Sequence, residues 1–332
     1  MSKVVLGFSG GVDSAVSAVL LKKQGFEVHG VYLDNTSERA RWEAITSAER
    51  MGVELTVLDV HEALEEKVCR PFADCYLRGE TPNPCILCNP SMKFPMLIRE
   101  ADRIGAELVA TGHYARAEGG ALYKGQPAND QSYMLCRLTK EQVSRLTLPL
   151  GGYEKKQVRA LAEEFGLPAA HKKDSMEICF IPDKDYVSWL RNRTPLPPPG
   201  PLFLHGEEIG QHRGIVCYTV GQRLPGLYDG RKVYISKINA ADNSIELSYW
   251  EELFRKEIMA ERFNWLCEVP SEDFPASVRV RHTKWETPNC LVHINPDSSV
   301  LIRCEEPVRA PAAGQSAVLY RGEQVIGGGF IL

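Results

Sequence analysis

The sequence has no long uninterrupted hydrophobic segment. Of its 332 residues, 44% are hydrophobic and 25% are charged, which is the composition of an ordinary globular protein. No run of about 18 apolar residues could span a bilayer, and the opening MSKVVLGF is too short to be the apolar core of a signal peptide. We therefore expect a cytoplasmic protein of two or three domains that does not interact with membranes.

A surplus of positive charge is also missing. The formal net charge is −4, so the overall charge does not favour nucleic acid, whose binding depends on local clusters of Lys and Arg. One such cluster is RVRHTKW, residues 279–285, which contains four basic or potentially basic side chains and no acidic one. Taken alone, such a cluster is more often a solvated face than a binding surface.

The ten cysteines are too few and too unevenly spaced for a disulfide-rich secreted protein, and only one CxxC is present. That pair, Cys85 and Cys88, stands among prolines in TPNPCILCNP, which we interpret as a loop. A structural zinc site needs a second pair, and a zinc deaminase needs a preceding His-x-Glu that the sequence lacks. A redox pair and a pair of reactive thiols both remain open.

A third cysteine, Cys179, lies in HKKDSMEICFIP. Lys172 and Lys173 precede it, and their positive charge is expected to lower the pKa of its thiol and to raise its thiolate fraction. Most of the ten cysteines should be buried and inert. Cys85, Cys88 and Cys179 are the candidates for chemistry.

The lysine of a Walker-type phosphate loop is absent, because the sequence contains no Gly-Lys pair. The segment SGGVDS instead stands between an apolar run and a helical pattern, where free backbone N–H groups and the helix dipole attract an anion. Gly10 and Gly11 would let the backbone approach phosphate, Ser9 and Ser14 offer hydroxyls, and Asp13 would either cap the helix or help to hold a magnesium ion.

The first 110 residues alternate short β-branched runs with longer helical patterns, which predicts a parallel α/β sheet. Three of the helices are expected to end at Gly25, Gly52 and Gly105. In such a sheet ligands bind beyond the carboxyl ends of the strands, where SGGVDS, the cysteine pair and TGHYAR all fall.

A proline-rich stretch, residues 194–202, marks a domain boundary because it cannot continue a helix or a central strand. Beyond it the pattern is all-β, with glycine turns and a division near 250–260. Predicted strands include residues 215–221 and the final segments of the chain.

Together these motifs resemble a known family. SGGVDS resembles the PP-loop of ATP pyrophosphatases, and with TPNPCILCN, ATGHYAR, KKDSMEICFIP, GQSAVLY and IGGGFI the chain resembles, nearly end to end, the tRNA-specific 2-thiouridylases. The resemblance implies a PP-loop domain in residues 1–195, a small central β-rich domain in 200–255, and a C-terminal, tRNA-contacting β-barrel in 256–332.

The implied activity replaces the C2 oxygen of a wobble uridine in tRNA with sulfur, after ATP, with Mg²⁺, has adenylated that oxygen. The implied partners are the tRNA and a sulfur donor such as a cysteine desulfurase or a persulfide relay protein. Cys179 would carry the sulfur as a persulfide. Cys88 would be its partner thiol, which either attacks that persulfide to release sulfide or completes a disulfide with Cys179 after direct transfer.

The resemblance also assigns binding residues. ATP would contact Gly7, Phe8, Ser9, Gly10, Gly11, Val12, Asp13, Ser14, Leu33 and Gly112. Cys85 would line the pocket of the flipped base with Asn83 and Pro84. The tRNA would further contact His113, Asn129, Asp130, Gln131, Arg281, His282 and Gln315.

The sequence departs from the family pattern in three places. Many members have aspartate at the position of Cys85, so Cys85, Cys88 and Cys179 could instead bind an iron–sulfur cluster, and the persulfide and cluster mechanisms both stay open. The segment between Leu33 and Val53 is short and lacks an Asn-Trp pair, and Met176-Glu177 replaces the usual Thr-Gly. Two other hypotheses are a PP-loop ligase that adenylates a carboxylate without cysteine chemistry and a non-catalytic RNA- or iron-binding relative.

Overall fold

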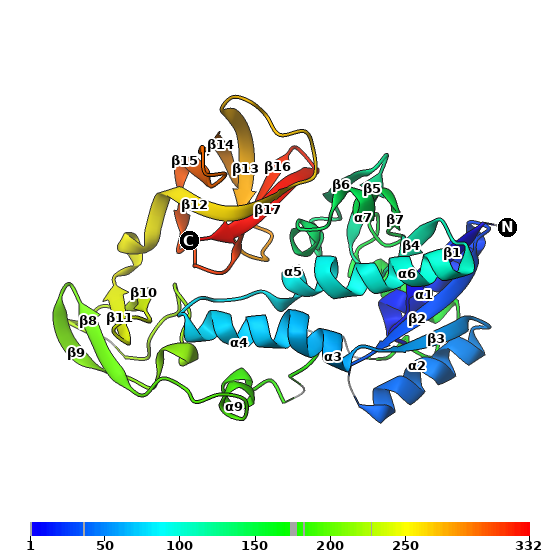
Figure 1. The fold of residues 1–332 in the computed structure, drawn as a ribbon, viewed down its shortest axis with the longest axis horizontal. Coiled ribbons are helices and arrows are strands. Elements are labelled where there is room, and N and C mark those ends of the chain that lie inside the picture. The colour runs from blue at the N-terminus through cyan, green and yellow to red at the C-terminus, as the bar shows by residue number, and fades with distance from the viewer. Residues whose placement is uncertain (1, 36, 173–177, 182, 227) are drawn as a thin grey trace.

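The N-terminal part of the chain forms a five-stranded parallel sheet. The computed structural model describes residues 2–35, 37–172, 178–181, 183–226 and 228–332 (Figure 1). The strands lie in the order β3-β2-β1-β4-β7, and each neighbouring pair is parallel. Their bounds are β1 Lys3–Gly7, β2 Glu27–Asp34, β3 Glu54–Asp59, β4 Leu108–Ala110 and β7 Leu146–Thr147. The prediction of an α/β parallel-sheet domain is confirmed.

The helices beside this sheet follow the predicted pattern. They include α1 Val12–Lys23, α2 Glu38–Arg50, α6 Phe94–Ile104 and α8 Lys155–Glu164. Gly25, Gly52 and Gly105 all have positive φ, as a left-handed helix end requires. The shorter helices are α7 Lys140–Ser144 and α9 Tyr186–Arg191, with 3₁₀ turns η3 Ser132–Leu135, η4 Ile215–Cys217 and η5 Trp250–Leu253.

Two long helical segments extend from the sheet toward the central domain (Figure 1). The first joins α3 His61–Leu64, a π turn at Glu65–Cys69 and α4 Arg70–Leu77. The second joins α5 Pro84–Cys88, a π turn at Asn89–Lys93 and α6.

The second segment corrects the expectation that Cys85 and Cys88 lie in a loop. Pro84 occupies the first turn of α5, where its missing N–H costs nothing. In both long segments a proline follows the π turn by two residues, at Pro71 and Pro95. Proline has no N–H to donate within the helix, and the wider π turn before it accommodates this missing hydrogen bond.

The central domain is a four-stranded sheet in the order β10-β11-β8-β9. Its strands are β8 Gly200–Leu204, β9 Glu207–His212, β10 Tyr234–Asn239 and β11 Ser244–Ser248. The strand predicted at 215–221 is wrong, because Ile215–Cys217 form a 3₁₀ turn. Ile215 and Val216 are buried in the same hydrophobic cluster as Phe72 of α4, which accounts for their apolar character without a strand.

The C-terminal domain is a closed barrel in the order β12-β15-β14-β13-β16-β17, completed by pairing of β12 with β17. Its strands are β12 Phe254–Trp265, β13 Phe274–Arg279, β14 Thr287–Ile294, β15 Val300–Arg309, β16 Ser316–Arg321 and β17 Gln324–Ile331. The predicted barrel is confirmed. The strand β12 was not predicted. Its charged residues obscure the alternation of apolar and polar residues that marks a strand, and two register shifts interrupt this alternation.

The barrel sheet continues into the N-terminal part of the chain. A hairpin of β5 Ala115–Glu118 and β6 Ala121–Lys124 adds to β17 where Tyr123 pairs with Gln324. The predicted domain boundaries stay predictions, but the hairpin shows that residues from both ends of the chain share one sheet.

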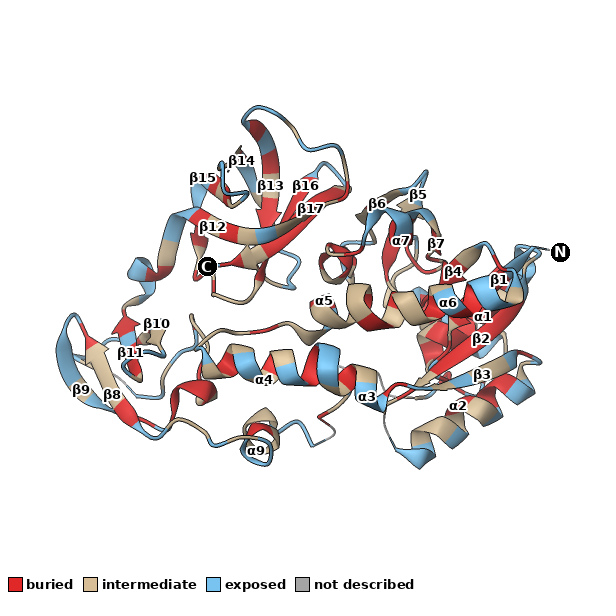
Figure 2. Cartoon of the chain, in the orientation of Figure 1, coloured by how far each residue is buried: buried red, intermediate tan, exposed pale blue. Residues whose placement is uncertain are grey.

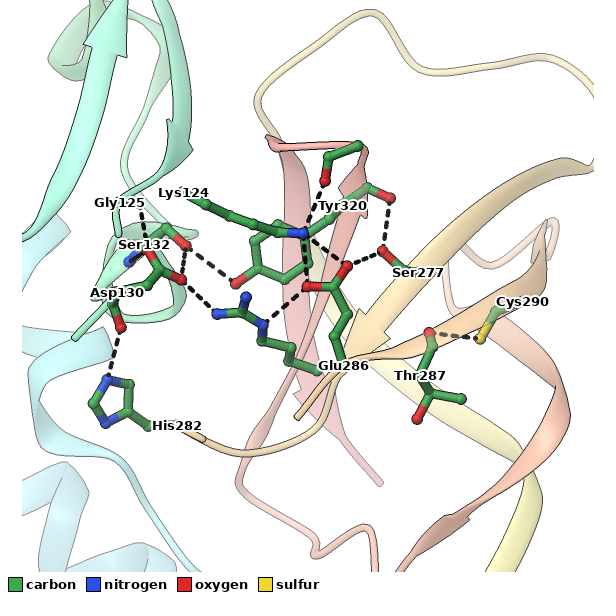
Figure 3. Close-up of polar contacts among 12 residues, drawn as sticks. Lys124, Gly125, Asp130, Ser132, Ser277, His282, Glu286, Thr287, Cys290 and Tyr320 are labelled. Carbon is green, nitrogen blue, oxygen red and sulfur yellow. Dashed lines mark hydrogen bonds and ion pairs between the residues drawn. The ribbon is translucent and has the colours of Figure 1, made fainter. Parts of the chain in front are cut away.

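A buried ion network reinforces this junction (Figure 3). Arg279 on β13 donates to the carboxylates of Asp130 and Glu286, and the side chains of Arg279 and Asp130 are 8% and 3% exposed. Lys124 on β6 pairs with Glu286 at 2.7 Å. Asp130 also accepts from the backbone N–H of Gly125 at 2.7 Å. Each buried charge therefore has both a partner of opposite sign and further hydrogen bonds.

The buried residues (Figure 2) form several hydrophobic clusters, and one of them joins Val5 of the parallel sheet to Val318 of the barrel. In the parallel sheet, Val4, Val5 and Leu6 are fully buried, as expected of a central strand covered on both faces. Among the residues that the structure describes, no helix is both long and apolar enough to cross a bilayer.

Replacing Arg279 with methionine is expected to lower the free energy of unfolding by about 3–5 kcal/mol, because Asp130 would be left buried and unpaired. Arg303→Met is the matched control, since Arg303 pairs with Glu257 on the exposed face of the barrel and should cost less than about 1 kcal/mol. Urea unfolding followed by circular dichroism measures both. Equal losses in the two variants would contradict the assignment.

Candidate functional site

The candidate site lies where the strand order reverses. β2 lies on one side of β1 and β4 on the other, so a crevice opens beyond the carboxyl ends of β1 and β4, which is where doubly wound sheets bind ligands. SGGVDS follows β1 and Thr111-Gly112-His113 follow β4. The structure therefore brings both motifs to one edge of the sheet.

The glycine corner after β1 is tightly packed. Gly10 has a φ of +71°, and a side-chain carbon there would lie 2.8 Å from the Cα of Ala44 on α2. Gly11 is the N-cap residue of α1 and has an ordinary extended conformation. The hydroxyls of Ser9 and Ser14 lie 3.3 Å apart. The corner thus combines the N-terminus of a twelve-residue helix with two hydroxyls, a suitable environment for phosphate oxygens.

The remaining expected ATP residues contribute mainly backbone. The side chains of Phe8 and Val12 are buried in the core, while Leu33 packs against two hydrophobic clusters at the end of β2. A side-chain carbon at Gly7 or Gly112 would approach neighbouring atoms within 3.3 or 2.9 Å, so both positions favour glycine.

Asp13 does not cap the helix. Its carboxylate accepts from Lys155 at 2.7 and 2.8 Å and from the hydroxyl of Tyr114 at 2.6 Å. Because these donors already hold the carboxylate, Asp13 is better suited to position Lys155 beside the corner than to bind a magnesium ion directly.

Cations do reach the corner, from distant parts of the sequence. Lys155 begins α8, and Lys172 donates to the carbonyl of Gly10 at 3.2 Å and to Glu43 at 2.9 Å. The lysine of a Walker loop is therefore replaced by two lysines that sequence spacing alone did not identify. Lys172 lies at the glycine corner rather than at the thiol of Cys179, so it does not serve the role expected from sequence; Lys173 is outside the described residues.

The cysteines lie at the end of β2 and on α5. Cys179 is exposed and accepts a hydrogen bond from Nδ2 of Asn35 at 3.5 Å, immediately beyond β2. Cys85 is exposed and its backbone N–H donates to Oδ1 of Asn83, which caps α5. Cys88 packs against a hydrophobic cluster that consists of Val60, Leu64, Val68, Cys69 and Met92. Cys85 and Cys179 both contribute to the electrostatic environment of Cys88, so the three cysteines lie near one another.

The thiols of Cys88 and Cys179 have raised pKa values, which favours their protonated forms at neutral pH. Burial raises the pKa of Cys88 to about 11, while the positive charge of Lys93 opposes that shift. Although Cys179 is partly exposed to solvent, the surrounding protein atoms desolvate its thiol and raise its pKa, and Cys85 adds to the effect, whereas Lys93 and Asn35 act in the opposite direction. The expectation of a lowered pKa at Cys179 is wrong for the described structure, because desolvation outweighs the nearby cation.

His113 lies close to the same cation. Burial and Lys93 hold its pKa well below the ordinary value, so the imidazole is neutral at physiological pH. Its Nδ1 is 2.7 Å from the hydroxyl of Thr111, and its ring stacks against Phe94. A neutral, oriented imidazole is suited to hydrogen bonding with a base rather than to pairing with phosphate.

Metal binding by the three cysteines would need a different arrangement. Within the described ranges, no three His, Cys, Asp or Glu side chains are grouped closely enough to hold a metal ion. The three thiols therefore do not form a ready ligand set for an iron–sulfur cluster. Met176 and Glu177, which depart from the family pattern, lie outside the described residues.

Several residues expected to contact tRNA are engaged within the protein. Asn129 accepts from the backbone N–H of Lys155 at 3.1 Å, and Gln131 accepts from that of Tyr114 at 3.0 Å. Gln315 donates to the carbonyl of Thr81 at 2.8 Å, which attaches the barrel to the segment preceding α5.

The other two expected contacts in the barrel differ in exposure. Arg281 donates to the carbonyls of Val220 and Ala310 at 2.6 and 2.9 Å, whereas His282 is exposed and its Nε2 lies 3.3 Å from the carbonyl of Asp130. The assigned tRNA roles stay predictions, and the engaged side chains are placed to shape the surface rather than to project from it.

Sequence reasoning missed Asn35, Lys93 and Lys155 as members of the site. Lys93 lies three residues after the quoted segment TPNPCILCNP and carried no assigned role, and Asn35 follows directly after the second predicted strand. A rule that polar residues just after parallel strands face the ligand crevice would have found Asn35.

Comparison with known proteins agrees with this arrangement. Three family models match the chain. The "tRNA methyl transferase HUP domain" matches residues 2–183, and the "tRNA methyl transferase PRC-barrel domain" matches residues 201–248. The "Aminomethyltransferase beta-barrel domain" matches residues 255–331. The tRNA-specific 2-thiouridylase MnmA 1 of Caldanaerobacter subterraneus subsp. tengcongensis is 39% identical over 99% of this chain and 98% of its own. The chain belongs to the tRNA-specific 2-thiouridylase family.

Other members support the same assignment over the full length. The MnmA enzyme of Pelotomaculum thermopropionicum is 41% identical over 99% of this chain and 97% of its own length. Among solved structures, NMN synthetase from Francisella tularensis is 21% identical over 52% of this chain and 66% of its own, with a TM-score of 0.35, too low to bear on function.

Gly10→Ala is expected to weaken ATP binding by about tenfold or more, because the added carbon would collide with α2 and the positive φ disfavours any side chain. Gly11→Ala is the matched control: its φ is −84° and the nearest atom would be Oγ of Ser9 at 3.4 Å. Isothermal titration calorimetry with ATP compares them. Similar losses in both variants would show that the packing against Ala44 is unimportant.

Lys93→Met is expected to raise the pKa of Cys88 further and to slow its alkylation at pH 8 by about three- to tenfold, since one pKa unit changes the thiolate fraction tenfold. In the wild type, alkylation of Cys88 should accelerate as the pH rises toward about 11. Mass spectrometry of the Cys88 peptide after iodoacetamide treatment gives the rates. Lys256→Met, on the exposed face of β12, is the control, and an unchanged rate in Lys93→Met would refute the electrostatic role.

Proposed function

We propose that this protein is an ATP-dependent sulfurtransferase that converts the wobble uridine of tRNA to 2-thiouridine. The observation that carries the proposal is the meeting of a phosphate-binding corner after β1 with the Cys179 thiol, which is bonded to Asn35 immediately beyond the adjacent strand β2. Adenylation and sulfur delivery would thus occur at one edge of one sheet.

The first step makes a poor leaving group into a good one. The C2 oxygen of the uridine attacks the α-phosphorus of MgATP, pyrophosphate leaves, and the oxygen becomes part of a phosphate ester. The N-terminus of α1, the hydroxyls of Ser9 and Ser14, and the lysines at positions 155 and 172 would stabilise the negative charge on the phosphates.

The second step transfers sulfur. The terminal sulfur of a Cys179 persulfide attacks C2 and AMP leaves, so that the base is joined to Cys179 through two sulfur atoms. The thiolate of Cys88 then attacks Sγ of Cys179, which releases the thiouridine and forms a Cys88–Cys179 disulfide. A thiol reductant must supply two electrons and two protons to restore both thiols, and a desulfurase or persulfide relay protein must reload Cys179.

The raised pKa values of Cys88 and Cys179 affect the reactivity of both thiols. A protonated thiol is a weak nucleophile, which protects the free enzyme from adventitious oxidation. Lys93 is the described cation that favours ionisation of both thiols, and it would also favour the anionic persulfide.

The uridine must leave the base stack to reach these groups. Asn83 and Pro84 begin α5 beside the exposed thiol of Cys85, and the neutral ring of His113 lies near Lys93. We assign these residues to the pocket of the flipped base. Cys85 stands where many family members have aspartate, so it offers a thiol rather than a carboxylate to the base.

Cys88→Ser and Cys179→Ser are each expected to reduce thiolation of an unmodified tRNA by about a thousandfold or more, because each removes a group that forms a covalent bond to sulfur. ATP binding should be unchanged in both. Cys217→Ser, in the central domain, is the control. Liquid chromatography and mass spectrometry of the nucleosides identify 2-thiouridine and distinguish it from a methylated product.

Peptide mapping must assign the disulfide, because Cys290 and Cys304 in the barrel lie with their sulfur atoms 3.0 Å apart and can be mistaken for the catalytic pair. Full activity in either catalytic variant would refute the sulfur pathway. Iron and acid-labile sulfide in the anaerobically purified active protein, with activity lost on chelation, would replace the persulfide pathway by one through an iron–sulfur cluster.

A further inference from the structure

The loop between β13 and β14 presents an unusual exposed surface. Its residues 282–285 are all exposed, and Trp285 has 78% of its surface accessible, more than any other large hydrophobic side chain among the described residues. An exposed tryptophan is costly to leave in water and is enriched where proteins contact partners. Neither the proposed reaction nor the packing of the barrel explains Trp285.

The loop is held firmly on both sides of the exposed residues. Before them, Arg281 donates to two backbone carbonyls, of Val220 in the central domain and of Ala310 in the barrel. After them, Glu286 is held by Lys124 and Arg279 in the buried network (Figure 3). Because Trp285 directly precedes Glu286, these ion pairs restrict the positions that its backbone can take, which lowers the entropy cost of binding through the indole.

The charges around Trp285 favour an anionic partner. Lys284 is exposed, and its Nζ lies 5.8 Å from the indole ring. His282 adds a second exposed basic side chain, and no acidic residue occurs in 279–285. A flat aromatic ring beside a cation is the combination with which proteins hold unpaired nucleotides, the ring stacking on the base and the cation meeting the phosphate.

The loop is also connected to the thiols through one short helix. His282 lies near the carbonyl of Asp130, and its ring centroid is 6.1 Å from that of Tyr133 on η3. On the other side of η3, Asn89 donates to the carbonyl of Met134 at 2.9 Å, and Asn89 directly follows Cys88. This series of contacts links the loop to the segment that carries Cys88.

We propose that Trp285 stacks on a nucleobase of the tRNA substrate other than the reacting uridine, and that Lys284 contacts the adjoining phosphate. This inference rests on the proposed function, since it takes tRNA as the substrate. Trp285 is then a specificity-determining residue, because it favours a tRNA that has an unpaired base in position to stack on the indole.

The test measures binding of unmodified, fluorescently labelled tRNA by anisotropy at several salt concentrations. Trp285→Ala should weaken binding by about tenfold, and Trp285→Phe should stay within about threefold of the wild type, because an aromatic ring retains stacking. Neither change should alter the slope of log affinity against log salt. Lys284→Ala should instead reduce that slope by about one, as loss of a phosphate contact does.

Trp42→Ala is the matched control, because Trp42 on α2 is 61% exposed but lies outside the loop, and it should bind tRNA like the wild type. Unchanged binding in Trp285→Ala, equal losses in Trp285→Phe and Trp285→Ala, or an equal loss in Trp42→Ala would overturn the stacking role. A change in the mass of the protein in solution with Trp285→Ala, without a change in RNA binding, would assign the residue to self-association and would also overturn it.

Failure of the proposed function is distinguishable from failure of this inference. A wild-type protein that binds tRNA without forming thiouridine would refute the function while the binding series still decides the role of Trp285. A wild-type protein that does not bind tRNA would overturn both.

Discussion

The ion pair between Arg279 and Asp130 constrains how the barrel lies relative to the parallel sheet. Two charges buried in a low-dielectric junction are tolerated only in a geometry that satisfies both, so the partners must return to the same relative position whenever the domains associate. Asp130 lies in the segment that leads into η3, and η3 contacts the helix carrying Cys88. A single electrostatic requirement therefore relates the position of the barrel to the segment that carries the thiols.

The parallel sheet and the glycine corner after β1 were predictable because they depend on local patterns. Unbroken apolar runs such as Val4–Leu6 identify strands covered on both faces, and the glycines at 25, 52 and 105 end helices for reasons of backbone sterics. The prolines around Cys85 were misleading. They indicate a loop by propensity, but Pro84 begins a helix and Pro95 follows a π turn, so position within the helix decided the outcome.

Other parts of the site could not be predicted because they depend on contacts between distant residues. Lys155 and Lys172 approach the glycine corner from beyond the sheet, and nothing in their own neighbourhoods indicates it. The ionisation of Cys179 was misjudged for the same reason: the lysine adjacent in sequence lies elsewhere, while desolvation and Cys85 control the thiol. Sequence proximity is a poor guide to electrostatics once the chain folds back on itself.

The pairing of β6 with β17 has a consequence for synthesis of the chain. Tyr123 on β6 and Gln324 on β17 are about 200 residues apart, so on the ribosome the hairpin exists long before its partner strand. During that interval β6 is an unpaired sheet edge, open to incorrect association with other extended segments. The nascent N-terminal domain therefore needs its own stability, or a chaperone, until β17 has been synthesised and can pair with β6.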